Sequence, residues 1–297
     1  MRKLFRAFWL FITFPIRSIV NIVHAIHKWL ARIVQQVRSL LYDEEEDAPL
    51  PDAFAKVVQN PQGVIYHLNI LRQHLFRALA AIALTTALSF VFINQILTFL
   101  ALPLEGGLES LTAIDVTENV GTVMRVALLS GFAISFPYVV FEIWLFIAPG
   151  VSPKTRLRGL AAIPVAIALF MLGMAFTYFA MLPTTLPFLF NFMGLNTVPR
   201  PSSYFNFVTG IMFWIGVAFE FPMVAYILAE LNILDSKTLA SQWRVAIVLI
   251  AVIAAAITPT VDPVNMAIVM GPMLILYVVS IGLTRFARRG KQKPATE

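Results

Sequence analysis

The feature that most narrows the fold of this chain is a series of apolar stretches, each about as long as a membrane is thick. A transmembrane helix needs about 20 predominantly apolar residues, and the sequence offers six candidates from Phe76 onward. Only 13% of the residues are charged, whereas soluble domains carry about a quarter charged residues. The sequence therefore predicts an all-α, polytopic membrane protein with six transmembrane helices. We place the spans near residues 76–100, 119–147, 159–182, 204–230, 244–258 and 265–284.

The fifth of these spans is unusually short. Its uncharged core, Val245 to Ile257, is only about 20 Å long as a helix, against a hydrocarbon layer of about 30 Å. Pro259 and Pro263 follow it closely and favour a tight turn. The last two spans are therefore predicted to form a short hairpin, with a re-entrant pair as the alternative.

Lysine and arginine residues gather on one side of this topology. They lie before the first span, in the 148–158 and 231–244 loops, and in the carboxyl-terminal tail. The opposite loops contain five acidic residues but a single cation, Arg200, and Arg125 lies near the outer end of the second span. Because cytoplasmic loops are enriched in cations, both termini are predicted to be cytoplasmic, which requires an even number of spans. The net charge of +6 is explained by this asymmetry, and we expect no nucleic-acid partner.

The chain is predicted to have four parts. Residues 1–42 are basic and aromatic, with apolar residues three or four apart, which is typical of a helix lying on a membrane surface. A secretory signal or an organellar transit peptide is less favoured, because no small-residue cleavage pattern follows and serines are few. Residues 43–63, acidic and then proline-containing, are predicted to be a solvated linker. The membrane domain covers 64–287, and 288–297 form a basic cytoplasmic tail.

Motifs of known enzyme classes are missing. The sequence contains no G-x-x-x-x-G-K-[ST] phosphate loop, no G-x-G-x-x-G turn and no cysteine. All four histidines precede the first span, which disfavours an intramembrane Ser–His pair or a zinc protease. We therefore expect a binding or transport protein with no cofactor and no metal ion.

Two carboxylates fall in the interior of predicted spans. A charged carboxylate there costs several kcal/mol unless it is paired, hydrated or protonated. Glu142 lies near the inner end of the second span, where an acid that reaches lipid headgroups and a functional acid are equally open. Glu220 lies past the middle of the fourth span, and we expect it to face a polar cavity or a partner.

Three prolines also lie within spans. Pro137, Pro164 and Pro222 are each expected to bend a helix, because proline removes a hydrogen bond and its ring clashes with the preceding turn. Pro222 is two residues from Glu220 and would leave free carbonyls beside it. Kinked spans favour a concave bundle, although simple helix curvature with no attached site is the alternative.

Several segments resemble the TatC family over about residues 64–287. The most specific is FEIWLFIAPG at 141–150, and the others are GMAFTYF at 173–179, IGVAFEFP at 215–222 and ITPT at 257–260. The resemblance implies a six-span receptor of the bacterial cytoplasmic membrane that binds twin-arginine signal peptides of folded precursor proteins. It also implies an oligomeric complex with single-span TatA- and TatB-type subunits, driven by the protonmotive force.

The resemblance assigns roles to individual residues. Pro103 matches a proline of the first outer loop and Tyr178 an outer aromatic residue of the third span. Glu220 matches a buried acid of the fourth span. Asn265 lies near a polar position of the sixth span where partner helices dock.

On the inner surface, Arg72, Phe146 and the 148–158 loop with Arg156 are the candidates for signal-peptide binding. Ile70 and Thr155 stand where the family has the two glutamates that bind the arginine pair, and neither offers a carboxylate for a guanidinium group. We hypothesise that Glu142 partly replaces these acids, or that the chain is specialised with altered recognition.

Two other interpretations remain open. A proton-coupled carrier of a small solute would use Glu220, although we find no inverted repeat of the kind such carriers contain. A TatC-like scaffold that has lost signal recognition is the second, and the substitutions at Ile70 and Thr155 leave it open.

Overall fold

The computed structural model describes residues 61–115, 117–151, 153–190, 199–258 and 263–289. The predicted extension at 1–42, nearly all of the linker and most of the basic tail lie outside these residues. Within the described residues the chain is helical and contains no strand. The α-helices are α3 (Pro61–Val91), α4 (Ile93–Ala101), α5 (Glu118–Ile147), α6 (Pro153–Phe176), α7 (Leu182–Phe190), α8 (Pro201–Phe219), α9 (Phe221–Glu230), α10 (Ser236–Ser241), α11 (Trp243–Ile257) and α12 (Pro263–Arg289).

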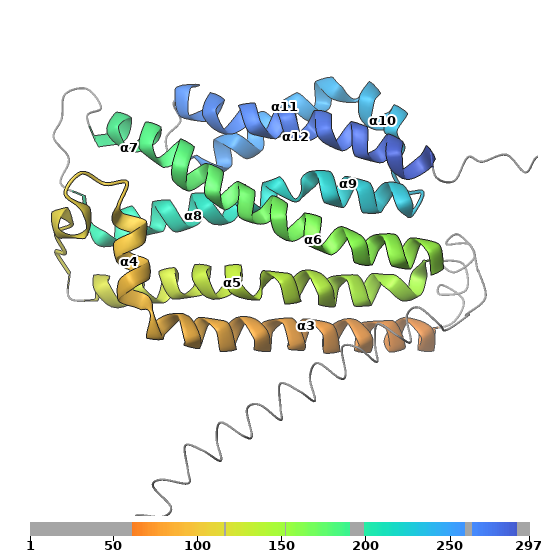
Figure 1. Ribbon diagram of the computed structural model, residues 1–297, viewed down its shortest axis with the longest axis horizontal. Helices are drawn as coiled ribbons and strands as arrows, with labels where there is room; N and C mark the ends of the chain where they lie inside the picture. Colours follow the sequence, from red (N-terminus) through yellow and green to blue (C-terminus); the bar gives the residue numbers. More distant parts are fainter. Residues whose placement is uncertain (1–60, 116, 152, 191–198, 259–262, 290–297) are drawn as a thin grey trace, which may run out of the picture.

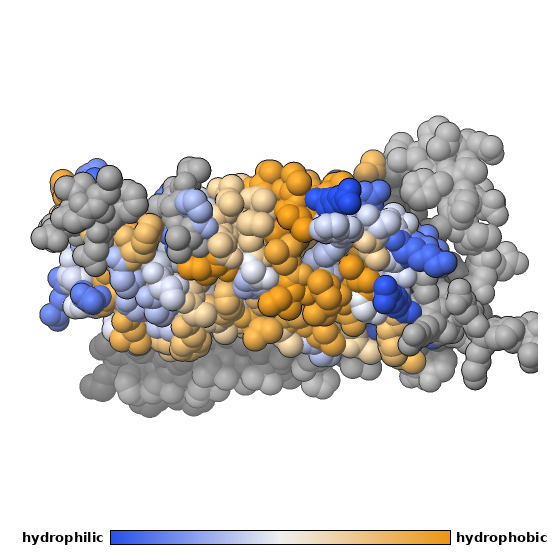
Figure 2. Space-filling model, turned by 90° about the horizontal axis from the view of Figure 1, so that it is seen from above, coloured by the Kyte–Doolittle hydropathy of each residue, from blue (hydrophilic) through white to orange (hydrophobic). Residues whose placement is uncertain are grey.

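The long helices run side by side along the long axis of the molecule, from α3 and α5 on one side to α11 and α12 on the other (Figure 1). Apolar side chains cover the middle of this axis, and polar residues lie toward both ends (Figure 2). Large apolar side chains such as Leu84 (73% exposed) and Val278 (66%) point outward, which a protein surrounded by lipid tolerates. The chain is a multi-pass membrane protein.

Among the residues that the structure describes, five stretches are long and apolar enough to cross a membrane, and α11 is a shorter sixth helix. With 15 residues, α11 is about 22 Å long. The prediction of a short fifth span is therefore confirmed. The five longer stretches are Leu68–Val91, Glu118–Ile147, Thr155–Phe190, Pro201–Glu230 and Asn265–Ala287.

The first span differs from its prediction, because the helix begins at Pro61 and is interrupted at Phe92. Beyond the interruption, α4 turns away from α3 (Figure 1). Two tyrosine hydroxyls hold its last turn, since Tyr178 donates to the carbonyl of Phe99 at 2.6 Å and Tyr204 to that of Leu100 at 2.8 Å. The carbonyls at a helix end lack partners within the helix, and these distant tyrosines supply them.

The third span is longer than predicted. A π-helical turn at Thr177–Met181 joins α6 to α7, so residues 183–190, predicted to lie in an outer loop, are helical. Leu182, Thr185 and Leu186 are buried, and the two leucines pack in one core cluster with Tyr204 and Val208. Packing against other helices outweighs the cost of the prolines in this segment.

Only one of the three prolines expected to bend a span coincides with an interrupted helix. Helices α5 and α6 continue through Pro137 and Pro164. The fourth span is divided at Glu220 into α8 and α9, and Pro222 lies in the first turn of α9. Proline is tolerated there, because the amide groups of the first turn have no partner within the helix.

Candidate functional site

Three helices meet at one end of the bundle, where the predicted cations lie. The start of α3, the end of α5 and the start of α6 lie together at the right of Figure 1, near the end of α9 and α10. We call this the basic end, and the opposite end, with α4, the turn before α5 and the start of α8, the acidic end.

At the basic end, Glu142 is buried between α5 and α3, with a side chain only 3% exposed. Its carboxylate lies 2.5 Å from Nδ1 of His74 and 3.9 Å from Nη1 of Arg77, and it accepts a hydrogen bond from the hydroxyl of Tyr138. A buried carboxylate that lacked such partners would be strongly destabilising. Glu142 is therefore an acid held within the bundle, and it does not reach outward to headgroups.

The other α3 and α5 candidates lie around this carboxylate. His74 is one helical turn beyond the half-buried Ile70, and its ring centroid lies 6.3 Å from that of Phe146. Arg72, by contrast, is exposed. The structure thus brings Glu142 and Phe146 together at His74, one helical turn from Ile70.

The turn between α5 and α6 is held by a hydrogen bond from the side chain of Arg156 to the backbone. Arg156 is 6% exposed, and its Nε donates to the carbonyl of Val151 at 3.0 Å. Thr155 is 4% exposed and lines a narrow crevice with Trp144, Gly159 and Glu230. The second position at which the resemblance predicts an acid therefore faces the interior of the bundle.

Glu230, the last residue of α9, was not among the functional residues predicted from the sequence. Its side chain is 4% exposed, Nη1 of Arg158 lies 3.2 Å from its Oε1, and the hydroxyl of Tyr226 donates to the same oxygen at 3.3 Å. In the sequence, this residue marks only the end of the predicted fourth span. A sequence pattern could have identified Glu230, because Tyr-x-x-x-Glu occurs at both 138–142 and 226–230.

The remaining candidates lie away from the basic end. Glu220 is half-buried at the break between α8 and α9, and its Oε1 has no hydrogen-bond partner among the described residues. Asn265 is 1% exposed near the start of α12, covered by the chain's own helices. Tyr178 anchors α4, as described above, and Pro103 is half-buried in the turn that follows α4.

Comparisons with known proteins agree with this arrangement. A sequence profile of the family described as Sec-independent protein translocase protein (TatC) matches residues 66–272. The chain belongs to the TatC family. The match includes α3 from its second turn to the first half of α12 and all the candidate residues, so this TatC chain is a subunit of the twin-arginine translocase.

Individual relatives support the same conclusion. The TatC proteins of Carboxydothermus hydrogenoformans and Deinococcus radiodurans are 31% and 33% identical over 230 residues. These alignments cover 77% and 75% of this chain and 95% and 85% of those proteins. A crystal structure of the twin-arginine translocase receptor TatC has a TM-score of 0.64 at 31% identity, covering 75% of this chain and all of that one. A second, in DDM, has a TM-score of 0.66 at 29% identity, covering 73% and 98%.

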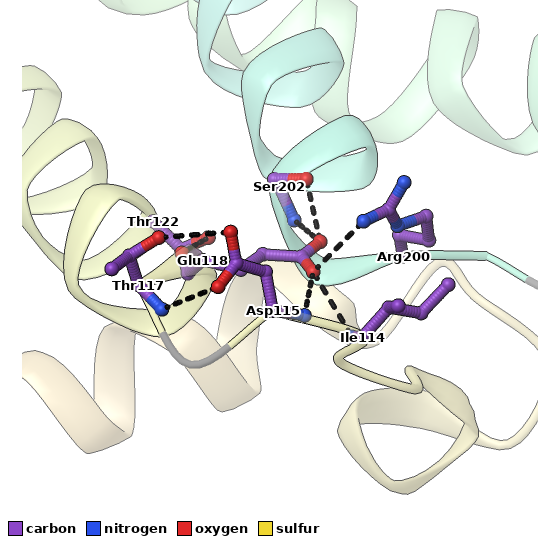
Figure 3. Close-up of polar contacts among 7 residues, drawn as sticks. All are labelled: Ile114, Asp115, Thr117, Glu118, Thr122, Arg200 and Ser202. Atoms are coloured by element: carbon purple, nitrogen blue, oxygen red, sulfur yellow. Dashed lines mark hydrogen bonds and ion pairs between the residues drawn. The ribbon is translucent and has the colours of Figure 1, made fainter.

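This TatC chain also has a polar cluster at the acidic end (Figure 3). Glu118, the first residue of α5, accepts hydrogen bonds from the hydroxyl and amide of Ser202 at 2.5 and 3.0 Å. The amide of Ile114 donates to its other oxygen at 3.2 Å, and Nη2 of Arg200 lies 3.5 Å from that oxygen. The one cation in the predicted outer loops therefore helps to tie the turn before α5 to the start of α8.

Replacing Glu118 by alanine is expected to lower the thermal midpoint of the chain in detergent by several degrees. The change leaves the amides of Ile114 and Ser202 without their acceptor, and unpaired amide groups are costly when water cannot replace the partner. The measurement is the fraction of monodisperse protein after heating. Glu109→Ala, an exposed acid of the same loop, is the control. Equal midpoints for the two variants would contradict the role of Glu118 as a tie.

An apolar groove lies between α8–α9 and α11–α12. It has a volume of ≈ 790 Å³, and Trp214, Phe221, Leu249 and Tyr277 are among its lining residues. The hydroxyl of Tyr277 donates to the carbonyl of Leu239, which fixes α10 against α12 at one end of the groove.

Proposed function

We propose that this chain is the receptor subunit that binds the arginine pair of twin-arginine signal peptides at its basic end. The observation that carries the proposal is the contact of α3 with α5, where Glu142 lies beside His74 and Phe146. Carboxylates bind guanidinium groups in a bidentate, charge-assisted manner. Glu142 provides a carboxylate beside His74, which lies one helical turn along α3 from Ile70, where the family has an acid.

The cation distribution supports a cytoplasmic location for the basic end. With six spans, both termini then lie in the cytoplasm, and the membrane is the cytoplasmic membrane of a bacterium. Signal peptides emerging from the cytoplasm would meet the basic end directly, with the exposed Arg72 and the 148–158 turn at its surface.

The test is binding of a labelled signal peptide to the purified chain in lipid nanodiscs. A peptide with the arginine pair is expected to bind at least about tenfold more tightly than one with two lysines. Lysine cannot form the bidentate contact, and a hydrogen bond to a charged group is worth about 1.5–3 kcal/mol, where 1.4 kcal/mol is tenfold. Equal binding of the two peptides would contradict the proposal.

Glu142→Gln is expected to reduce binding of the arginine peptide about tenfold, because the amide keeps the shape of the side chain and removes its charge. Binding of the lysine peptide is expected to change less. Glu109→Gln at the acidic end is the matched control. Unchanged binding in Glu142→Gln would exclude Glu142 as the acid that replaces the family position.

A scaffold without signal recognition is the second candidate. It is favoured by the observation that Glu142 already has His74 and Tyr138 as partners. Its expected result is rescue of export of a twin-arginine reporter, in cells lacking TatC, only by Ile70→Glu combined with Thr155→Glu. Rescue by the unchanged chain would exclude this candidate.

Partner subunits complete the proposal. Single-span TatA- and TatB-type helices would pack on α11 and α12, where the apolar groove offers a surface within the membrane. Because Asn265 is buried by the chain's own helices, its amide would reach a partner only if α12 shifted. The short α11 would thin the bilayer locally at a modest cost, which would assist passage of a folded cargo driven by the protonmotive force.

A further inference from the structure

We propose that Glu230 is a second guanidinium-binding carboxylate of this chain and that Arg158 occupies it until a signal peptide arrives. The inference rests on the proposed function, because it names the residue that would bind the second arginine of the pair. It concerns a residue for which the sequence analysis had no role.

The same arrangement of side chains occurs twice at the basic end. In each copy a tyrosine hydroxyl donates to the glutamate four residues later, Tyr138 to Glu142 and Tyr226 to Glu230. In each copy an arginine from another helix also approaches the carboxylate. Nη1 of Arg77 from α3 lies 3.9 Å from Glu142, whose nearer partner is His74, and Nη1 of Arg158 from α6 lies 3.2 Å from Glu230. The glutamate side chains are 3% and 4% exposed, whereas the arginine side chains are 45% and 39% exposed. Each carboxylate is thus buried, but its arginine is accessible.

The Glu230 carboxylate also lies in the crevice that a family acid at position 155 would enter. Thr155 and Glu230 line the same narrow crevice, one from α6 and the other from α9. A carboxylate on α9 therefore reaches the space that a longer acidic side chain at position 155 would occupy. Glu142 does not serve this position, because it faces α3, whereas Trp144, two residues later, faces the crevice.

Arg158 is suited to being displaced. One of its nitrogens lies 3.2 Å from one carboxylate oxygen, and its side chain is 39% exposed. When an incoming guanidinium takes the carboxylate, the long Arg158 side chain can extend to the membrane surface and keep its charge hydrated. The exchange leaves the buried carboxylate paired throughout, so no uncompensated charge forms in the interior.

The experiment measures binding of the arginine and lysine peptides to the full chain in nanodiscs. Glu230→Gln is expected to weaken binding of the arginine peptide about tenfold, the loss of one charged hydrogen bond. Thr155→Glu in the Glu230→Gln background is expected to restore most of the binding. Glu109→Gln is the control for loss of an acid elsewhere.

The Arg158→Lys variant distinguishes a Glu230 carboxylate that binds signal peptides from one that only forms a structural ion pair. Lysine keeps the charge and the pair with Glu230 but competes less well for a carboxylate than a guanidinium does. The arginine peptide is therefore expected to bind a few-fold more tightly to Arg158→Lys. Unchanged or weaker binding would overturn the inference, and this variant retains the ion pair if Glu230→Gln fails to fold.

Failure of the inference and failure of the proposed function give different results. A wild-type chain that prefers the arginine peptide, together with a Glu230→Gln variant of equal affinity, would overturn only the role of Glu230. A wild-type chain that binds both peptides equally would overturn the proposed function and this inference with it.

Discussion

A valine at position 131 is expected to prevent α3 and α5 from packing and to leave little folded protein. A Cβ atom at Gly131 would lie 2.3 Å from Oγ1 of Thr86 and 2.6 Å from its Cα, so the backbone of α3 would have to move. The hydroxyl of Thr85 also donates to the carbonyl of Gly131 at 2.7 Å. Helices in membranes associate through such close contacts between small residues.

The expected loss of stability in Gly131→Val follows from overpacking, because methylene groups added to a packed core cost about 1–3 kcal/mol or more. Because α3 carries His74 and Arg77, a shift of this helix would also separate them from Glu142. The measurements are the yield of monodisperse protein and the binding of the arginine peptide. Gly121→Val is the control, because a Cβ atom at Gly121 meets nothing within 4 Å. Equal yields for the two variants would contradict the close approach of α3 and α5.

Phe170→Ala is expected to lower the free energy of unfolding by about 3 kcal/mol, at the low end for a buried phenylalanine because lipid replaces water as the solvent of the unfolded helices. The Phe170 side chain is fully buried and stacks on Phe136 with ring centroids 3.9 Å apart. Its ring also lies edge-on to Phe132 at 5.8 Å. Phe170 therefore joins α6 to α5 at the centre of the bundle.

The measurement is reversible unfolding in mixed detergent micelles, with Phe286→Ala as the control because Phe286 is 72% exposed. A second residue makes the test sharper. A Cβ atom at Gly216 of α8 would lie 2.8 Å from the ring of Phe170. Gly216→Ala is therefore expected to destabilise the wild-type chain but to be tolerated with Phe170→Ala. Additive effects of the two changes would show that the residues do not share this contact.

The transmembrane segments were largely predictable, and the exceptions have identifiable causes. Hydropathy located α5, α8–α9 and the short α11, because transfer into lipid depends mainly on the composition of each stretch. It did not predict the interruption at Phe92, which is stabilised by hydroxyls of Tyr178 and Tyr204 from far along the chain. Hydropathy also did not predict α7. Its prolines indicate a loop in the sequence, but its leucines are buried against other helices in the structure.

The candidate site was likewise predictable from the sequence only in part. The sequence identified Glu142 as an expensive carboxylate and noted the absence of acids at Ile70 and Thr155. It could not predict that Glu142 pairs with His74, 68 residues earlier, or that Glu230 pairs with Arg158, 72 residues earlier. Such pairs depend on which faces of separate helices meet, and the spacing of residues along one helix does not contain that information.

The sequence by itself determined the membrane-spanning character, the short α11 and the clustering of cations in alternate loops, because each depends on the local composition of the chain. Its motifs, by their resemblance, indicated the family. Only the tertiary structure decided which carboxylates are buried and which cations neutralise them. A charge in a membrane interior is tolerated only beside a partner, and here those partners come from other helices.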